Sequence, residues 1–231
     1  MQEWVTFHGF ATPVDADFGP ATEIAVQLFQ EANGLTASGI VDESTWDQFV
    51  APLARALAPM QIAADDTLAK VLLRVAQQHL AQHPLELGGE NRGVWVRLYM
   101  GGNEGPEWRW CAGFITFLLK QACSLLACPM PIHGSYSCDS LAYQAQMAGL
   151  YVRGTSLESG AISWAELGDT QIFLVRRTST DWTHTGLAFA GVLDTFATIE
   201  GNTNDEGFNN GYEVCQRTRG VSEKDFIRLP V

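Results

Sequence analysis

Four residues between positions 111 and 202 have side chains that could act together in catalysis. Cys111 offers a thiol nucleophile and His184 an imidazole base, while Glu200 and Asn202 offer a carboxylate or an amide that could orient the imidazole. Cysteine hydrolases are assembled from such groups, which lie far apart in the sequence and converge in the fold. The residue types and their order therefore favour an enzyme with a cysteine nucleophile.

The surroundings of Cys111 agree with this interpretation. Cys111 is expected to begin a helix, where unpaired backbone amides and the helix dipole favour an anion and help the thiol to ionise. Trp108 and Trp110 come just before it and, with Trp182, could line a cleft for substrate. Each feature also has a purely structural explanation, because a cysteine that opens an apolar helix is more often simply buried.

The other two segments have the same two interpretations. His184 begins a β-like run and is expected at a strand edge, where a lone histidine is often structural. Glu200 and Asn202 are expected where a strand gives way to a Gly/Asn turn, so either could hold the imidazole tautomer. Asn202 and Asn204 could instead serve only the turn. The combination of segments is more specific than any one of them.

Composition excludes several classes of partner. The 231 residues are 46% hydrophobic and 17% charged, typical of a globular protein with room for one large domain or a small and a medium one. The formal net charge of −12 argues against nucleic acid and anionic membranes. No apolar run reaches the roughly 20 residues that span a bilayer, so no membrane insertion is expected. Residues 1–4 lack the features of a secretory signal, and export is expected to need host lysis or a dedicated secretion machine.

The cysteines suggest neither a metal site nor an organic cofactor. The five of them, Cys111, Cys123, Cys128, Cys138 and Cys215, form no CxxC pair and have no metal-ligand spacing. An odd number leaves at least one free thiol in a monomer, and Cys111 is the candidate. A Cys138–Cys215 or Cys123–Cys128 disulfide is an alternative to the other four being small buried hydrophobes.

The first part of the chain is predicted to be helical. Pro20 opens a helix that ends near Gly34, with one apolar face. Asp42 is expected to cap a second helix that Pro52 ends or kinks. The predicted apolar face of the first helix consists of Ala21, Ala25, Leu28, Phe29 and Ala32, and the second helix carries Trp46, Phe49 and Val50.

The remainder of the chain is predicted to mix helices and strands. Residues 52–64 are typical of a connector, after which Asp65 or Asp66 is expected to cap a helix that Pro84 closes. Cys111 opens the next helix, and strand-like segments follow at 171–176, 185–192 and 196–200.

Residues 65–231 resemble a known enzyme family. The segments Trp-Cys-Ala-Gly-Phe (110–114), His-Thr-Gly (184–186) and Ile-Glu-Gly-Asn-Thr-Asn (199–204) are similar to the signature of CHAP-type amidohydrolases in the NlpC/P60 papain-like superfamily. The similarity includes residues 90–93 and 137–142. By this resemblance Cys111 is the nucleophile and His184 the general base. Glu200 orients the histidine, and Asn202 is an alternative or additional polar partner.

Residues 1–55 resemble the type 1 peptidoglycan-binding domain, a small three-helix module. The similarity is carried by residues 15–22, 25–26, 29–30, 33–35, 39, 41 and 45–46. Ala16 stands where that family usually has glycine, and the first helix is shortened to about residues 2–7. Asp17 and Phe18 are expected to contact the wall polymer. A helical docking module without glycan affinity is the alternative.

Together the two resemblances predict an α+β protein that acts on the bacterial cell wall. A helical peptidoglycan-binding domain (1–55) and a linker (56–64) precede a papain-like domain (65–231), in which a helix bearing the nucleophile packs on an antiparallel sheet. The expected activity is cleavage of an amide bond in peptidoglycan, by an amidase or an endopeptidase. The expected setting is a lysin or a secreted antibacterial effector, and an effector implies an immunity protein as partner. A wall-binding protein without activity, or a transferase or deamidase on proteins, are the alternatives.

Overall fold

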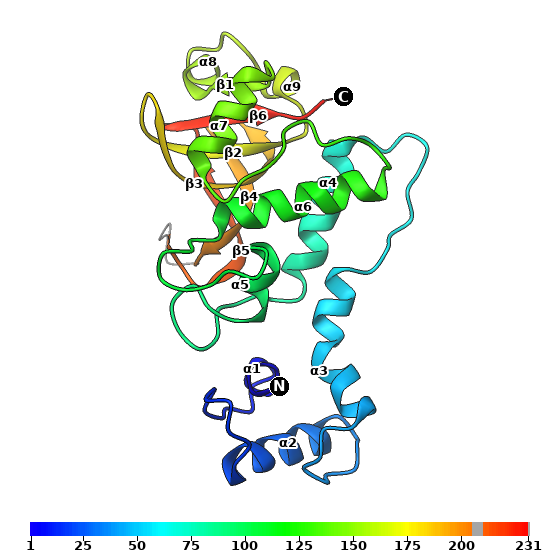
Figure 1. Ribbon diagram of the computed structural model, residues 1–231. Coiled ribbons are helices and arrows are strands. Elements are labelled where there is room, and N and C mark those ends of the chain that lie inside the picture. The colour runs from blue at the N-terminus through cyan, green and yellow to red at the C-terminus, as the bar shows by residue number, and fades with distance from the viewer. Residues whose placement is uncertain (205–209, 231) are drawn as a thin grey trace.

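The chain consists of a small helical part and a larger α+β part (Figure 1). The structure, a computed structural model, describes residues 1–204 and 210–230. The small part contains α1 (Gln2–Phe7), α2 (Pro20–Ala32) and α3 (Glu43–Ala56). The helices of the larger part are α4 (Leu68–Leu80), α5 (Val94–Tyr99), α6 (Cys111–Leu125), α7 (Cys138–Met147), α8 (Gly154–Glu158) and α9 (Trp164–Leu167).

The buried face of α2 differs from the predicted one. Ala25 and Phe29 are buried as expected, but Leu28 is 48% exposed, and Ala21 and Ala32 lie on the surface. Two polar residues complete the buried stripe, because each finds hydrogen-bond partners inside: Thr22 accepts from Gln2, and Gln30 donates to the Ile40 carbonyl. The buried face of α2 is therefore rotated by part of a helical turn from the face that the apolar pattern predicted.

Two helix boundaries also differ from expectation. Asp42 caps α3 as predicted, accepting from the Thr45 amide at 2.8 Å, but the helix continues past Pro52 to Ala56. Of the two predicted alternatives at Pro52, an end or a kink, the structure therefore excludes the end. At α4 the cap is Thr67, whose hydroxyl accepts from the Lys70 amide, and neither Asp65 nor Asp66 fills that position.

The small helical part is packed directly on α5. Trp4 and Phe7 both place their rings against Trp95, with ring centroids 6.3 and 6.0 Å apart. Beside them Arg97 donates to both Glu3 and Glu104, at 3.0 and 2.6 Å from the same nitrogen. The contact therefore combines apolar burial with a partly exposed charge network.

Within residues 1–204 and 210–230, the sheet has six antiparallel strands in the order β1-β6-β2-β3-β4-β5. The central strands β2, β3 and β4 extend the three segments predicted as strands. The strands are β1 (Tyr151–Arg153), β2 (Thr170–Thr178), β3 (Asp181–Val192), β4 (Thr195–Thr203), β5 (Glu213–Gly220) and β6 (Lys224–Arg228).

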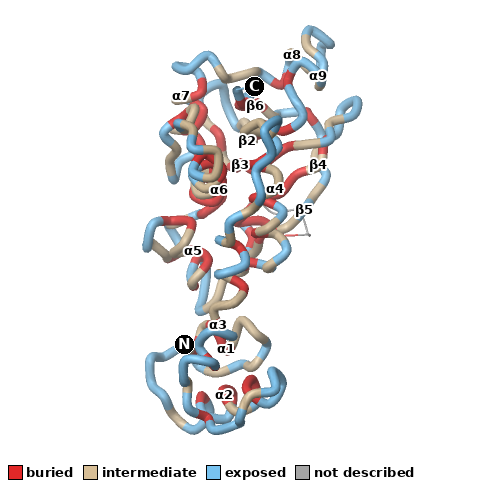
Figure 2. The backbone as a smooth tube through the Cα atoms, turned by 90° about the vertical axis from the view of Figure 1, so that its right-hand side faces the viewer, coloured by how far each residue is buried: buried red, intermediate tan, exposed pale blue. Residues whose placement is uncertain are grey.

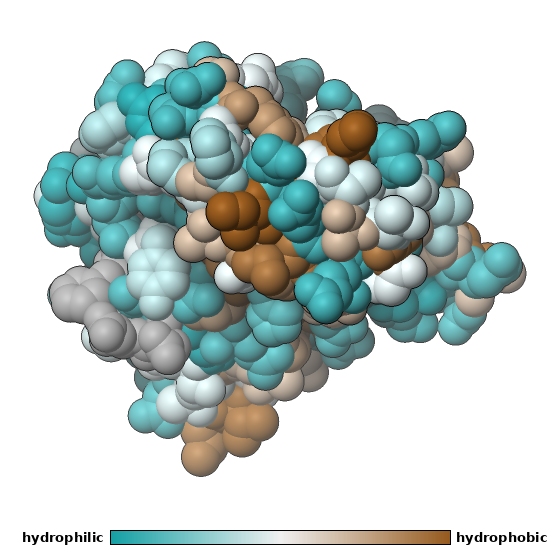
Figure 3. Space-filling view, turned by 90° about the horizontal axis from the view of Figure 1, so that it is seen from below, coloured by the Kyte–Doolittle hydropathy of each residue, from teal (hydrophilic) through white to brown (hydrophobic). Residues whose placement is uncertain are grey.

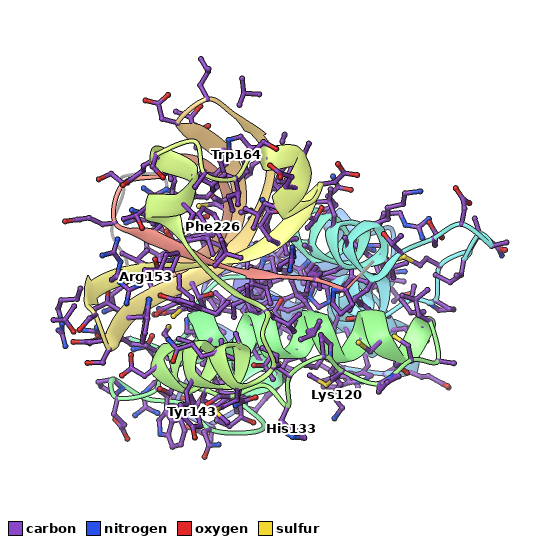
Figure 4. All side chains as sticks on the ribbon, turned by 90° about the horizontal axis from the view of Figure 1, so that it is seen from above. Lys120, His133, Tyr143, Arg153, Trp164 and Phe226 are labelled. Carbon is purple, nitrogen blue, oxygen red and sulfur yellow. The ribbon has the colours of Figure 1, made fainter. Side chains whose placement is uncertain are left out.

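Helices cover both faces of the sheet. The main core lies between the sheet and α4, α6 and α7, and Figure 2 shows buried segments concentrated there. A second cluster lies on the other face, where Trp164 of α9 packs on Phe196 and Phe226. Figure 4 shows Trp164 and Phe226 on one side of the sheet, and Lys120, His133 and Tyr143 toward the α6 and α7 side. This arrangement confirms the α+β class, with a helical region followed by an antiparallel sheet.

Candidate active site

The structure brings Cys111, His184 and Glu200 together between α6 and the sheet. Cys111 is the first residue of α6, and His184 and Glu200 lie on the neighbouring strands β3 and β4. The His184 Nε2 atom is 2.8 Å from Glu200 Oε2. The other ring nitrogen, Nδ1, is buried, and the Cys111 thiol is close enough to raise the pKa of His184. His184 is fully buried, which corrects the expectation of a strand-edge position.

Two glycines permit this close approach. Gly201 follows Glu200 in β4, and a Cβ atom there would lie 2.7 Å from Trp110 and 2.8 Å from Phe114. Gly186 follows His184 by two residues, and a Cβ atom there would lie 2.8 Å from the Glu200 side chain. Real Cβ atoms do not come so near to other atoms, so both positions require glycine for packing.

The thiol of Cys111 is in an environment that favours its ionised form. A hydrogen bond from Cys138 is the main influence that lowers the pKa of Cys111; burial opposes it, and the charge of His184 and the Thr185 amide lower the pKa further. The net result is a pKa well below that of an ordinary thiol. Trp110 supplies no side-chain cap to α6, so the first backbone amides of this helix remain available to an anion.

His184 is held in its protonated form by its neighbours. Burial lowers the pKa of His184, but the charge of Cys111 and the hydrogen bonds with Cys111 and Glu200 outweigh burial and raise it to about 9. The two groups therefore favour a thiolate beside an imidazolium. Such a pair is a ready nucleophile with an adjacent acid.

Glu200 is a fully buried carboxylate with several donors. Arg219 donates from Nε to Oε1 and from Nη2 to Oε2, both at 2.6 Å, and the Thr198 hydroxyl donates to Oε1 at 2.6 Å. Burial raises the pKa of Glu200, but the donors from Arg219 and then His184 outweigh it and leave the pKa well below its usual range. Glu200 is therefore ionised and fixed in position.

Asn202 lies near this site but does not contact His184. Its side-chain nitrogen donates to the Gly211 carbonyl at 2.9 Å and to Asn91 Oδ1 at 3.0 Å. Its backbone has a φ of 55°, in the left-handed region that asparagine tolerates, at the irregularity between Glu200 and Thr203. The geometry therefore assigns the contact with the imidazole to Glu200, and Asn202 shapes the end of β4.

A second, half-buried carboxylate fixes the residue before the thiol. Glu86 accepts from the Trp110 indole at 2.8 Å and from the Asn91 amide at 2.7 Å. Burial raises its pKa, and these two donors oppose the rise. Trp110 stacks on Tyr99 and is fully buried, so it cannot line an open cleft, contrary to expectation.

The other aromatic candidates divide between core and surface. Trp182 is also buried, with its indole donating to Asp225 at 2.8 Å, so its role is structural. Trp108 is half-buried and lies edge-on to Tyr136, with ring centroids 6.3 Å apart. Tyr136 is 45% exposed and precedes α7, so these two aromatics together offer contact area at the surface.

The remaining candidates lie in the small helical part. Asp17 is exposed and its carbonyl accepts from Gln2, while Phe18 is 50% exposed. The helices of this part, α1–α3, lie at the opposite end of the molecule from α7 (Figure 1). Figure 3 views that end from below and shows brown hydrophobic patches among hydrophilic atoms.

Sequence reasoning missed two residues that complete the site. Cys138 begins α7 and its Sγ lies 3.8 Å from the Sγ of Cys111. Arg219 comes from β5, a strand that was not predicted. Cys123, Cys128 and Cys138 are free thiols, so neither the Cys138–Cys215 nor the Cys123–Cys128 disulfide is present. The signal for Cys138 was its place after Ser137, a helix-capping residue whose hydroxyl accepts from the Ser140 amide.

Comparison with known proteins identifies the small helical part. Residues 1–49 match the family described as "Putative peptidoglycan binding domain". This match supports the N-terminal peptidoglycan-binding domain and peptidoglycan as a partner. No curated protein and no solved structure matches the chain. Within the part of the chain that the structure describes, no helix is long and apolar enough to span a bilayer.

Proposed function

We propose that this protein is a peptidoglycan hydrolase that cleaves an amide bond with Cys111 as nucleophile. One observation carries the proposal: a thiol at the start of α6 adjoins an imidazole whose far nitrogen is 2.8 Å from a buried carboxylate. A nucleophile, a base and a group that orients the base are the parts that acyl transfer requires. The family match at residues 1–49 supports the polymer on which the enzyme acts.

The reaction follows from the protonation states of the pair. The Cys111 thiolate attacks the carbonyl carbon of the amide, and His184 donates its proton to the leaving amine, which gives a thioester. His184, now neutral, takes a proton from water as the water attacks the thioester, and the acid product and the thiol are released. Glu200 orients the imidazole throughout.

The start of α6 supplies a place for the oxyanion. The backbone amide of Cys111 has no intrahelical acceptor at this position, and α6 has no side-chain cap. Donors that are already oriented toward developing negative charge contribute strongly to such reactions. Trp108 and Tyr136, at the surface beside the two helix starts, would contact the sugar or the peptide stem.

The papain-like assignment belongs to this proposal. It is supported by the position of the thiol on helix α6 and of the imidazole on the adjacent sheet. Two bonds fit the chemistry: the bond between N-acetylmuramate and L-alanine, and a bond within the stem or the cross-bridge. No metal ion or organic cofactor enters either scheme.

The helical domain would hold the enzyme on its polymer. Tethering raises the local concentration of substrate at the catalytic domain. Asp17 and Phe18, both exposed, are the proposed contacts. A lysin or a secreted antibacterial effector, the latter with an immunity protein, is the proposed setting, with action on the cell wall.

Digestion of purified peptidoglycan tests the proposal. Wild type, Cys111→Ala and the matched control Cys215→Ala would be compared, with released fragments identified by mass spectrometry. Wild type and Cys215→Ala are expected to release the same fragments, whose masses name the bond, and Cys111→Ala none. Equal release by Cys111→Ala would reject the nucleophile.

A wall-binding protein without hydrolytic activity is the second candidate, favoured by the match at residues 1–49. Sedimentation with insoluble peptidoglycan separates the two. Binding without fragment release by any of the three proteins, on walls from several bacteria, would favour this second candidate.

A further inference from the structure

The starts of α6 and α7 place two thiols in contact. Cys111 Sγ and Cys138 Sγ are 3.8 Å apart, and the two residues are 3% and 7% exposed. Each is the first residue of its helix. The hydrogen bond with Cys111 and burial raise the pKa of Cys138, so Cys138 keeps its proton beside the Cys111 thiolate. The hydrolytic scheme uses only one of these sulfurs as nucleophile.

We propose that Cys138 is a resolving thiol, which forms a reversible disulfide with Cys111 when a hydroperoxide oxidises the nucleophile. The proposal rests on the reactive Cys111 thiolate of the proposed function. It assigns a modification site and an oxidant class, hydrogen peroxide or an organic hydroperoxide, to a pair of residues that are far apart in the sequence.

The chemistry proceeds in two balanced steps. The Cys111 thiolate attacks one peroxide oxygen, the O–O bond breaks, and hydroxide leaves, which produces a sulfenic acid on Cys111. The Cys138 sulfur then attacks the Cys111 sulfur while its thiol loses a proton, and the S–OH bond breaks. Hydroxide leaves with that proton as water, and the S–S bond remains. Two thiols and one hydroperoxide thus yield one disulfide, one water and one water or alcohol.

The geometry favours this outcome over further oxidation. A disulfide bond is about 2.05 Å long, so the two sulfurs must approach by only about 1.8 Å from their present contact. The resolving sulfur already touches the site at which the sulfenic acid forms. While the disulfide is present, Cys111 cannot act as the nucleophile in hydrolysis. The disulfide also prevents further oxidation of Cys111 to sulfinic acid, which thiols do not reduce back to the thiol.

A second cysteine pair serves as a matched control. Burial and then the neighbouring Cys128 raise the pKa of Cys123 to about 12. That thiol is therefore protonated near neutral pH and reacts slowly with peroxide. The Cys111–Cys138 and Cys123–Cys128 pairs are exposed to the same peroxide in the same protein, but only the first contains a thiolate.

Mass spectrometry of the full-length protein tests the proposal. Reduced protein would be treated with a small excess of hydrogen peroxide, alkylated and digested with trypsin, which cuts after Arg109, Lys120 and Arg153. Cys111 then lies in peptide 110–120, and Cys123, Cys128 and Cys138 lie in peptide 121–153. Wild type is expected to give the two peptides linked, with the loss of two hydrogens.

Three variants assign the link. Cys123→Ser and Cys128→Ser are expected to keep it. Cys138→Ser, which retains a hydroxyl donor at the start of α7, is expected to lose it and to gain two oxygens on peptide 110–120. A link that persists in Cys138→Ser, or sulfinic acid on Cys111 of the wild type without a link, would overturn the proposal. Circular dichroism checks that Cys138→Ser is folded.

The readout is independent of wall cleavage. If the disulfide forms but Cys111→Ala still digests peptidoglycan, the proposed function fails and the redox pair stands. If wild type digests peptidoglycan but forms no link, the redox pair fails alone. Loss of fragment release after peroxide, with recovery after a dithiol reductant, is expected where both hold.

Discussion

Arg219 donates two hydrogen bonds to Glu200, one to each carboxylate oxygen, at 2.6 Å. Glu200 has no exposed surface, and Arg219 is 11% exposed, so the ion pair is almost entirely removed from water. A bidentate arginine is rigid as well as strongly attracted to its partner. The pair therefore sets both the charge and the direction of the group that contacts His184.

Replacement of Arg219 by glutamine should destabilise the protein, because it leaves a buried carboxylate without its main counter-charge. The expected loss in the free energy of unfolding is about 3–5 kcal/mol, measured in urea at pH 7. Arg217→Gln is the control on the same strand; Arg217 donates to the Thr203 hydroxyl, and its loss should cost less than about 1 kcal/mol. Equal losses would contradict the argument.

Alkylation of Cys111 should report its thiolate directly. Because the pKa of Cys111 is lowered, iodoacetamide is expected to modify it readily at pH 6, whereas Cys123, with its pKa raised to about 12, stays unmodified. His184→Ala removes a positive neighbour, raises the pKa of the thiol and should slow the reaction at pH 6 by about tenfold or more. Equal rates in wild type and His184→Ala would show that the two groups do not interact.

The pH dependence of wall cleavage should have an alkaline limit near the pKa of His184, about 9. Above it the ring loses the proton that the leaving amine requires. Glu200→Gln removes a negative charge that favours the imidazolium, so the pKa of His184 falls and the limit should move down by about one pH unit. Glu166→Gln, at the exposed cap of α9, is the control and should leave the profile unchanged.

An alanine at Gly201 should disturb the junction between β4 and α6. Its methyl group would fall within 2.9 Å of Trp110 and Phe114, so strand and helix must separate. The expected cost is about 1–3 kcal/mol in unfolding free energy, with reduced wall cleavage, since Glu200 adjoins this position. Gly220→Ala meets only an ordinary contact at 3.7 Å and should be nearly neutral in both measurements.

Ala16 is strained, and glycine should relieve the strain. Its φ of 64° lies in the left-handed region, at the position where the peptidoglycan-binding family usually has glycine. Ala16→Gly is expected to stabilise the N-terminal domain by up to about 1 kcal/mol, because the unfavourable Cβ contact is lost. Ala54→Gly, on the exposed side of α3, should destabilise by about 1 kcal/mol. Denaturant unfolding of both variants measures the two opposite signs.

The sequence predicted the long helices α2, α3, α4 and α6, the central strands, and the convergence of Cys111, His184 and Glu200. Those predictions depended on local patterns, such as Pro20 at a helix start and the glycines beside the polar residues. The burial of Trp110 could not be predicted in the same way, because an aromatic side chain beside Cys111 could equally well pack into the core or line the surface. Its inward direction follows from Glu86, which lies in another segment.

Two further contacts depend on tertiary structure alone. Cys138 meets Cys111 only because α7 packs across the same sheet as α6, and no spacing in the sequence encodes that distance. Arg219 reaches Glu200 through the register of β5 on β4, in which Glu200 lies opposite Cys215.

The complete burial of His184 and Glu200 also determines how the site responds to salt. Counter-ions in solution weaken an exposed pair such as Lys70 and Asp65, whose side chains are 49% and 84% exposed. They cannot come between two groups that have no contact with water. The charges of His184 and Glu200 are therefore expected to be the same at high and at low salt. Binding of peptidoglycan through the exposed surface of the helical domain is expected to depend on ionic strength.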